Sequence, residues 1–192
     1  RGIQLNADWS TSLGATKHNI SVGLRVHEDE EDRLQRNSTF SQKSGALVLD
    51  DLGLLGNAGN RVQSAEALAI HVYDRIELDR WVITPGLRYE DIDQQRQRWE
   101  TRASRTTNPS IRSAASLRDQ RENKTQVWLP GIGASYQISD SNVAFAGAHK
   151  GFTAPTNAPN VNEETAINYE LGLRHSGDFY AEATLFLSDY DN

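Results

Sequence analysis

Hydrophobic and polar residues alternate along several stretches of the chain, most fully along Ala65–Glu90. The apolar face of its first half consists of Leu68, Ile70, Val72 and Ile76. A polar corner follows at residues 77–80, and the alternation resumes from Trp81. A period of two residues predicts β-strands with one apolar and one polar face. Strands of about a dozen residues exceed the usual five or six and suit a tilted crossing of a membrane.

The same hairpin unit recurs along the chain. Eight strands are expected, at about residues 2–12, 18–27, 65–76, 81–90, 125–138, 143–151, 166–175 and 179–190. Short turns join them into four hairpins, and the long connections between the hairpins span about residues 28–63, 96–123 and 152–165. Connections of that length are unusual in compact soluble domains. Their alternation with short turns is typical of outer-membrane barrels, whose turns are periplasmic and whose loops are extracellular.

The pattern therefore predicts an all-β fold, an antiparallel transmembrane β-barrel portion with eight strands in four hairpins. Trp81, Tyr136 and Phe179 each lie beside a short turn, where an aromatic girdle would meet the membrane interface. Pro85 lies inside a predicted strand and has no N–H for the ladder, so we expect a local bulge or a missing ladder bond beside it.

Composition narrows the class further. The chain has 192 residues, 37% of them hydrophobic, and no run approaches the ~20 apolar residues of a helical span. It has no cysteine, which excludes disulfides and thiolate metal sites, and its net charge of −6 argues against nucleic-acid binding. It begins at Arg1 without a signal peptide and ends directly after a strand-like run, so we expect a fragment of a larger protein.

Four segments carry sequence motifs in addition to the alternation of apolar and polar residues. They read WVITPGLRYE at 81–90, LPGIGASY at 129–136, HKGFTAP at 149–155 and NYELGLR at 168–174. In motif, order and spacing they resemble the barrel strands of TonB-dependent outer-membrane receptors. The acidic run after His27 and the Asp32-Arg33 pair are similar to the ferric-dicitrate branch of that family.

The resemblance implies that residues 1–192 form a partial barrel domain whose plug and remaining strands are absent. The whole receptor would lie in the bacterial outer membrane, in contact with lipid and lipopolysaccharide. It would import a ferric siderophore or similar iron chelate with energy from TonB, through the missing plug. A small self-contained eight-stranded structural or adhesion barrel remains an alternative. An enzyme is not expected, since no Gly-x-Ser-x-Gly elbow or other catalytic constellation is present, and no cofactor is implied.

Arginines concentrate in the predicted connection 96–123. We expect Arg96, Arg98, Arg102 and Arg105 to bind an anionic iron chelate, because guanidinium groups offer fixed multidentate donors to carboxylates. Contact with lipopolysaccharide phosphates, or simple solvation, is the competing interpretation. The acidic stretch 27–32 is interpreted as a solvated loop rather than a site for a hard cation, and no metal site is predicted.

Overall fold

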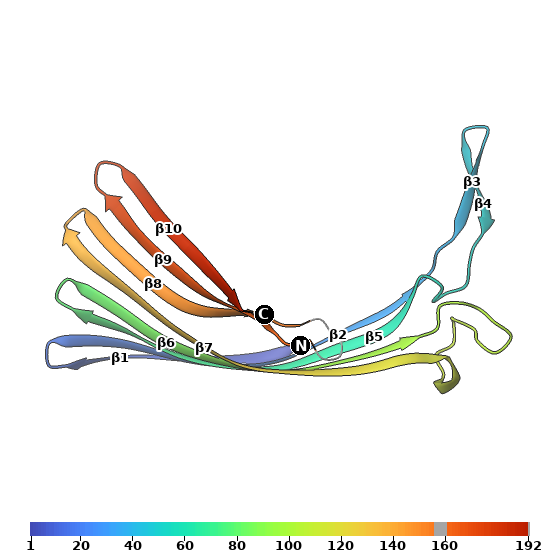
Figure 1. Ribbon diagram of the computed structural model, residues 1–192, viewed down its shortest axis with the longest axis horizontal. Helices are drawn as coiled ribbons and strands as arrows, with labels where there is room; N and C mark the ends of the chain where they lie inside the picture. Colours follow the sequence, from blue (N-terminus) through green and yellow to red (C-terminus); the bar gives the residue numbers. More distant parts are fainter. Residues whose placement is uncertain (156–160, 192) are drawn as a thin grey trace.

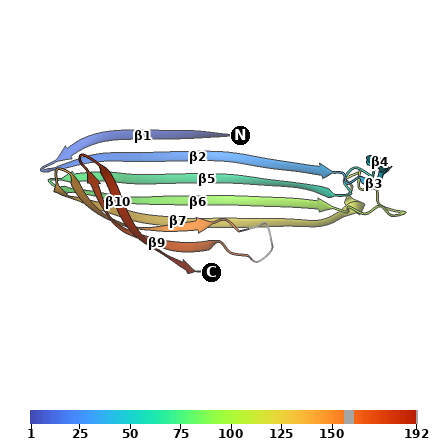
Figure 2. The same ribbon diagram turned by 90° about the horizontal axis from the view of Figure 1, so that it is seen from above.

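The computed structural model describes residues 1–155 and 161–191, and its main feature is one antiparallel sheet of eight strands. The strands follow one another in the order β1-β2-β5-β6-β7-β8-β9-β10. Their bounds are Gly2–Leu13 (β1), Thr16–Gln35 (β2), Gly59–Leu78 (β5), Trp81–Trp99 (β6), Leu117–Ser139 (β7), Asn142–Thr153 (β8), Glu164–Ser176 (β9) and Tyr180–Asp191 (β10). The sheet is curved like a section of a barrel wall (Figures 1 and 2). The eight predicted strands in four hairpins are confirmed.

β1 and β10 form the two edges of this sheet, and within the described residues they do not pair with each other. A self-contained eight-stranded barrel would require that pairing. The described part of the chain is thus an open section of wall, which gives the alternative of a small closed barrel no support.

The connections differ at the two ends of the sheet. At one end tight turns close all four hairpins, and Asp79 adopts a positive φ of 50° in the turn between β5 and β6. The first two long connections lie at the far tip of the longer strands (Figure 1), and the third joins β8 to β9. Among the described residues, no helix is long and apolar enough to cross a membrane, a finding that does not concern strands.

The first long connection is much shorter than the predicted 28–63. β2 continues to Gln35 and β5 begins at Gly59, and between them lies a separate hairpin of β3 (Thr39–Lys43) and β4 (Ala46–Asp51). The acidic stretch 27–32 therefore lies in a strand, and its interpretation as a loop is wrong. Backbone pairing with β5 keeps this polar stretch extended, although its sequence has no apolar face.

The second connection is also shorter than predicted. β6 continues to Trp99, and β7 begins at Leu117 after a short 3-10 helix at Ala114–Ser116. Arg96 and Arg98 consequently lie in a strand rather than in a loop. The third connection runs between Thr153 and Glu164, close to the predicted 152–165, but residues 156–160 of that prediction lie outside the described residues.

The outward face of the sheet carries an apolar band. Its exposed members include Leu24, Val26, Ile70, Val72, Leu87, Ile132, Leu171, Leu173 and Leu185. Two aromatic pairs bound the band where it crosses β6 and β7: the rings of Trp81 and Tyr136 lie 4.8 Å apart, and those of Tyr89 and Trp128 lie 4.6 Å apart.

The eight residue steps from Trp81 to Tyr89 span about 26 Å along the strand, or about 20 Å of depth at a tilt of about 40°. That depth approaches the ~25 Å apolar band of outer-membrane barrels, which aromatic girdles flank on both sides. The structure places Trp81 and Tyr136 in the girdle beside the turns, as expected. It adds a second aromatic row at Tyr89 and Trp128, which the sequence analysis missed.

Pro85 interrupts the pairing of β6 with β5. Tyr73 pairs with Gly86 and Ile76 pairs with Ile83, in the same register, with no pair between them. On its other side β6 pairs with β7 continuously, Pro85 lying opposite Ile132. Of the two expectations, the missing ladder bond is confirmed and the bulge is wrong, because the register does not shift.

Candidate functional site

Beyond the row of Tyr89 and Trp128, the inward face of β2, β5, β6 and β7 carries three rows of paired, mostly polar side chains. The register of the four strands places these residues directly across from one another. The upper row is Arg33, Arg61, Arg98 and Asp119; the middle row is Glu31, Gln63, Arg96 and Arg121; the lower row is Asp29, Ala65, Gln94 and Asn123. Together they form the arginine wall.

The arginine wall brings like charges together. In the upper row Arg33, Arg61 and Arg98 are direct neighbours, and in the middle row Arg96 lies beside Arg121. Like charges directly opposite in a sheet destabilise it, by up to about 1 kcal/mol a pair. The folded sheet therefore holds these arginines side by side at some loss of stability. Such clustering of cations is the arrangement expected where an anion is to be bound.

Few carboxylates offset these charges. Asp119 faces three guanidinium groups: its Oδ2 lies 3.1 Å from Nη2 of Arg98 and 3.7 Å from Nη2 of Arg121, and its Oδ1 lies 3.9 Å from Nη2 of Arg96. Glu31 accepts a hydrogen bond from Nη2 of Arg61 at 3.1 Å. Five arginines against three acids leave the wall with an excess of positive charge.

Part of the donor capacity of the wall is unused. The buried Nε atoms of Arg33, Arg61 and Arg96 have no hydrogen-bond partner. Arg96 lies outside the membrane-crossing part of its strand. Its burial lowers the pKa of its guanidinium, and the charge of Arg121 lowers that pKa further, while Asp119 acts in the opposite direction. Buried, unpaired donors among crowded cations suit an anionic oxygen ligand.

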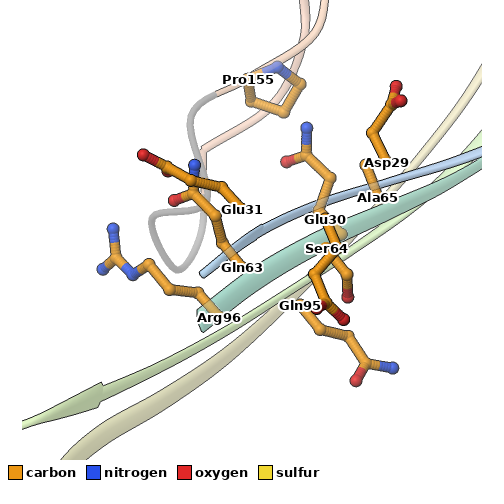
Figure 3. A pocket seen from close by; sticks show the side chains of 10 residues that line it. Asp29, Glu30, Glu31, Gln63, Ser64, Ala65, Gln95, Arg96 and Pro155 are labelled. Carbon is orange, nitrogen blue, oxygen red and sulfur yellow. The ribbon is translucent and has the colours of Figure 1, made fainter. Parts of the chain in front are cut away.

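A hollow of about 490 Å³ lies against this wall. Figure 3 shows Glu31, Gln63 and Arg96 projecting from neighbouring strands, while Gln95 points away on the opposite face. Pro155, from the connection after β8, lines the same hollow, and Asn123 donates from its Nδ2 to the carbonyl of Val161 at 3.3 Å. The described ends of that connection thus fold over the inward face.

The structure divides the four predicted ligand-binding arginines into two pairs. Arg96 and Arg98 project inward from β6 and share Asp119. Arg102 and Arg105 lie exposed in the connection after β6, and within the described residues neither belongs to an ion pair. Sequence reasoning missed Arg33, Arg61 and Asp119 as members of one site. The available signal was the period-two spacing of charges in β2 and β6, which continues after the apolar pattern ends.

Arg112 has a structural role in the second connection. It donates from Nη2 to Asp32 Oδ1 at 2.6 Å and from Nε to Asn60 Oδ1 at 2.9 Å, and its guanidinium lies 4.9 Å from the Trp99 ring centre. Asn60 also donates to the carbonyl of the buried Pro109 at 2.9 Å. These contacts hold the connection 100–116 against the ends of β2 and β5.

A second polar cluster lies on the outward face near the tight turns. His18 Nδ1 lies 2.6 Å from Asp74 Oδ2, and His18 Nε2 lies 2.9 Å from Thr16 Oγ1, which is the order of groups in a catalytic triad. The Thr16 hydroxyl, however, donates its proton to the carbonyl of Leu13 at 2.8 Å. It therefore accepts from His18 rather than donating to it, and is not activated for attack.

The same contacts give the Asp74 carboxylate a partner on the outward face. His18 lies between the two groups, with Nε2 toward Thr16 and Nδ1 toward Asp74. A paired carboxylate costs less than a lone one on an apolar wall. In the described chain no group of three or more His, Asp or Glu side chains could hold a metal ion.

The fold has counterparts in known proteins. The family model for the TonB dependent receptor-like β-barrel matches residues 1–192. Among solved structures, the unliganded ferric citrate transporter FecA is 23% identical with a TM-score of 0.74, over 98% of this chain and 27% of its own. The ferric-catecholate import receptor Fiu from K12 E. coli, in its closed form, is 14% identical with a TM-score of 0.73, over 98% of this chain and 31% of its own.

The siderophore receptor PiuA from Acinetobacter baumannii is 15% identical with a TM-score of 0.71, over 95% of this chain and 30% of its own. At these identities the likeness establishes the fold, and the chain spans less than a third of each of these receptors. The family is one of transport receptors, in agreement with the expectation that the chain is not an enzyme. The chain belongs to the TonB-dependent receptor-like β-barrel family of the bacterial outer membrane.

Proposed function

We propose that this chain is the ligand-binding section of an outer-membrane receptor that imports a ferric siderophore or similar anionic iron chelate with TonB-coupled energy. The observation that carries the proposal is the arginine wall, where cations are crowded on the inward face above the membrane band. Guanidinium groups match carboxylate and catecholate oxygens in geometry and charge.

Arg96 and Arg98 are the central ligand-binding residues in this proposal. Both side chains belong to the arginine wall, and Arg96 lines the hollow that Pro155, after β8, also lines. Arg102 and Arg105 lie in the exposed connection, where they would meet the chelate first as it approaches. Their contribution is to the rate of encounter, because exposed charges mainly steer association.

Binding of ferric citrate to the intact receptor in detergent micelles tests this division. Arg96→Gln or Arg98→Gln should raise the Kd at least about tenfold, since a hydrogen bond to a charged group contributes about 1.5–3 kcal/mol. The Arg102→Gln/Arg105→Gln variant should mainly slow association, and more so at low salt. Arg80→Gln, at the opposite end of β6, is the matched control. Unchanged affinity in both wall variants would refute the proposal.

Energy coupling is tested separately, by uptake of radiolabelled ferric citrate into cells that produce the intact receptor. A protonophore should abolish uptake and leave surface binding intact, because the energy comes from the inner membrane. Uptake that continues without the proton gradient would contradict the TonB-coupled part of the proposal.

The outward face is proposed to contact lipid and lipopolysaccharide. Beyond Tyr89 it changes from apolar to charged, with Asp91 and Asp93 of β6 both 3.2 Å from Nζ of Lys124 on β7. A charged zone just outside an aromatic girdle is where lipid headgroups lie.

A further inference from the structure

Asp119 occupies an unusual position in the arginine wall. Its carboxylate is about one-fifth exposed and lies within 4 Å of three guanidinium groups, those of Arg96, Arg98 and Arg121. Arg98 is its direct cross-strand partner, and Arg96 and Arg121 form the pair of the neighbouring row. One anion is thus shared by three cations.

The sharing is loose. A strong arginine–carboxylate pair is bidentate, with two parallel N–H···O bonds of about 2.7–2.9 Å. The contacts of Asp119 measure 3.1, 3.7 and 3.9 Å, and its Oδ1 is buried without a hydrogen-bond partner. In the described part of the wall, none of these arginines makes a bidentate pair with this carboxylate. The three arginines therefore keep hydrogen-bond donors for another anion.

We propose that Asp119 is an internal competitor for the ligand: it balances the arginines while the site is empty and yields them to a carboxylate of the chelate on binding. The inference rests on the proposed function and goes further, because it names carboxylate chelates as the ligand class and identifies a residue that limits their affinity. A bound carboxylate next to Asp119 is repelled by it, and like charges juxtaposed in a binding site oppose binding.

A positioning role for Asp119 predicts the opposite change in affinity. If Asp119 instead positions the arginines for the ligand, removing its charge lets them spread apart, and affinity falls. The sign of the change in Kd therefore decides between a competitor and a positioning residue.

The experiment measures binding of ferric citrate to the intact receptor in micelles by titration calorimetry. Asp119→Asn keeps the shape of the side chain and removes its charge, and should lower the Kd by about three- to tenfold, mainly through slower dissociation. Asp93→Asn is the matched control, since Asp93 lies on the outward face of β6. It should leave the Kd unchanged.

Two further measurements complete the test. A neutral ferric trihydroxamate should not gain affinity from Asp119→Asn, because it presents no carboxylate to compete. If Asp119→Asn does not assemble in the membrane, the double variant Arg98→Gln/Asp119→Asn keeps the net charge of the upper row. It should then bind ferric citrate at least as tightly as Arg98→Gln alone.

The outcomes separate the two proposals. If Arg96→Gln weakens binding of ferric citrate while Asp119→Asn leaves it unchanged or weakens it, the competitor role is overturned and the proposed function stands. If neither substitution changes the Kd, the site itself is wrong. Equal gains with the neutral chelate would overturn the assignment of carboxylates as the ligand class.

Discussion

A charge placed at the middle of the outward band tests whether that band faces hydrocarbon. Ile132 is the position for it, because it lies four residues from Trp128 and four from Tyr136, the members of the two aromatic rows on β7. Its side chain points outward and the residue is 54% exposed in this chain, so more than half of its surface can face lipid.

The expected loss of stability depends on how deep in the bilayer the introduced charge lies. Four residues correspond to about 13 Å along the strand and about 10 Å of depth from either aromatic row at a tilt of about 40°. Ile132→Arg therefore puts a guanidinium close to the bilayer midplane, where arginine on a barrel wall costs about 2–4 kcal/mol. Gln126→Arg makes the matched change just outside the aromatic row of Tyr89 and Trp128, two residues beyond Trp128, where the cost falls to about 0–1 kcal/mol.

The assay is reversible unfolding of the intact receptor in phospholipid vesicles, followed by tryptophan fluorescence against denaturant. Ile132→Arg should lower the free energy of unfolding by about 2–4 kcal/mol, and Gln126→Arg by no more than about 1 kcal/mol. Equal losses at the two positions would refute the assignment of the outward band to the membrane interior.

Three predictions concern the polar contacts outside the arginine wall. Arg112→Ala should raise amide hydrogen exchange in the connection 100–116 by about ten- to 150-fold, as lost charged hydrogen bonds contribute about 1.5–3 kcal/mol. In the parent protein, Arg112 holds the pKa of Asp32 below its ordinary value, so the protection factor of this connection should be unchanged at pH 5 and should fall as the pH drops below about 4; a protection factor that does not change with pH would contradict it. His18→Ala should destabilise the receptor by about 1–3 kcal/mol by leaving Asp74 unpaired, and His18→Ala/Asp74→Leu should recover most of that loss in the same unfolding assay; no recovery would count against the pair.

The sequence predicted the strands well where one face is apolar. The alternation around Leu68–Val72 and from Trp81 to Tyr89 located the membrane-crossing parts of β5 and β6, and with them the turn at Asp79. Burial of an apolar face against lipid specifies both the period and the register of a strand. For the same reason, four hairpins and their order could be read from the sequence.

The parts of the strands above the membrane could not be predicted in the same way. Residues 27–35 and 91–99 have water on at least one face and carry charges on both, so no apolar face marks them as strands. Their extended form depends on hydrogen bonds to neighbouring strands that are distant in sequence, such as those of β2 with β5. Residue type alone therefore pointed to Arg96 and Arg98 of the candidate site, but it could not indicate their neighbours Arg33, Arg61 and Asp119.

The continuous register from the membrane band to the arginine wall determines which sequence changes the receptor family can accept here. Inserting or deleting one residue in β6 between Tyr89 and Arg96 would turn every arginine beyond it to the outer surface, because side chains alternate with a period of two. The same insertion in the connection 100–116 would leave the register of both strands intact. Homologues should therefore differ by substitution along the wall and by length in the connections, so that ligand preference evolves without realignment of the strands.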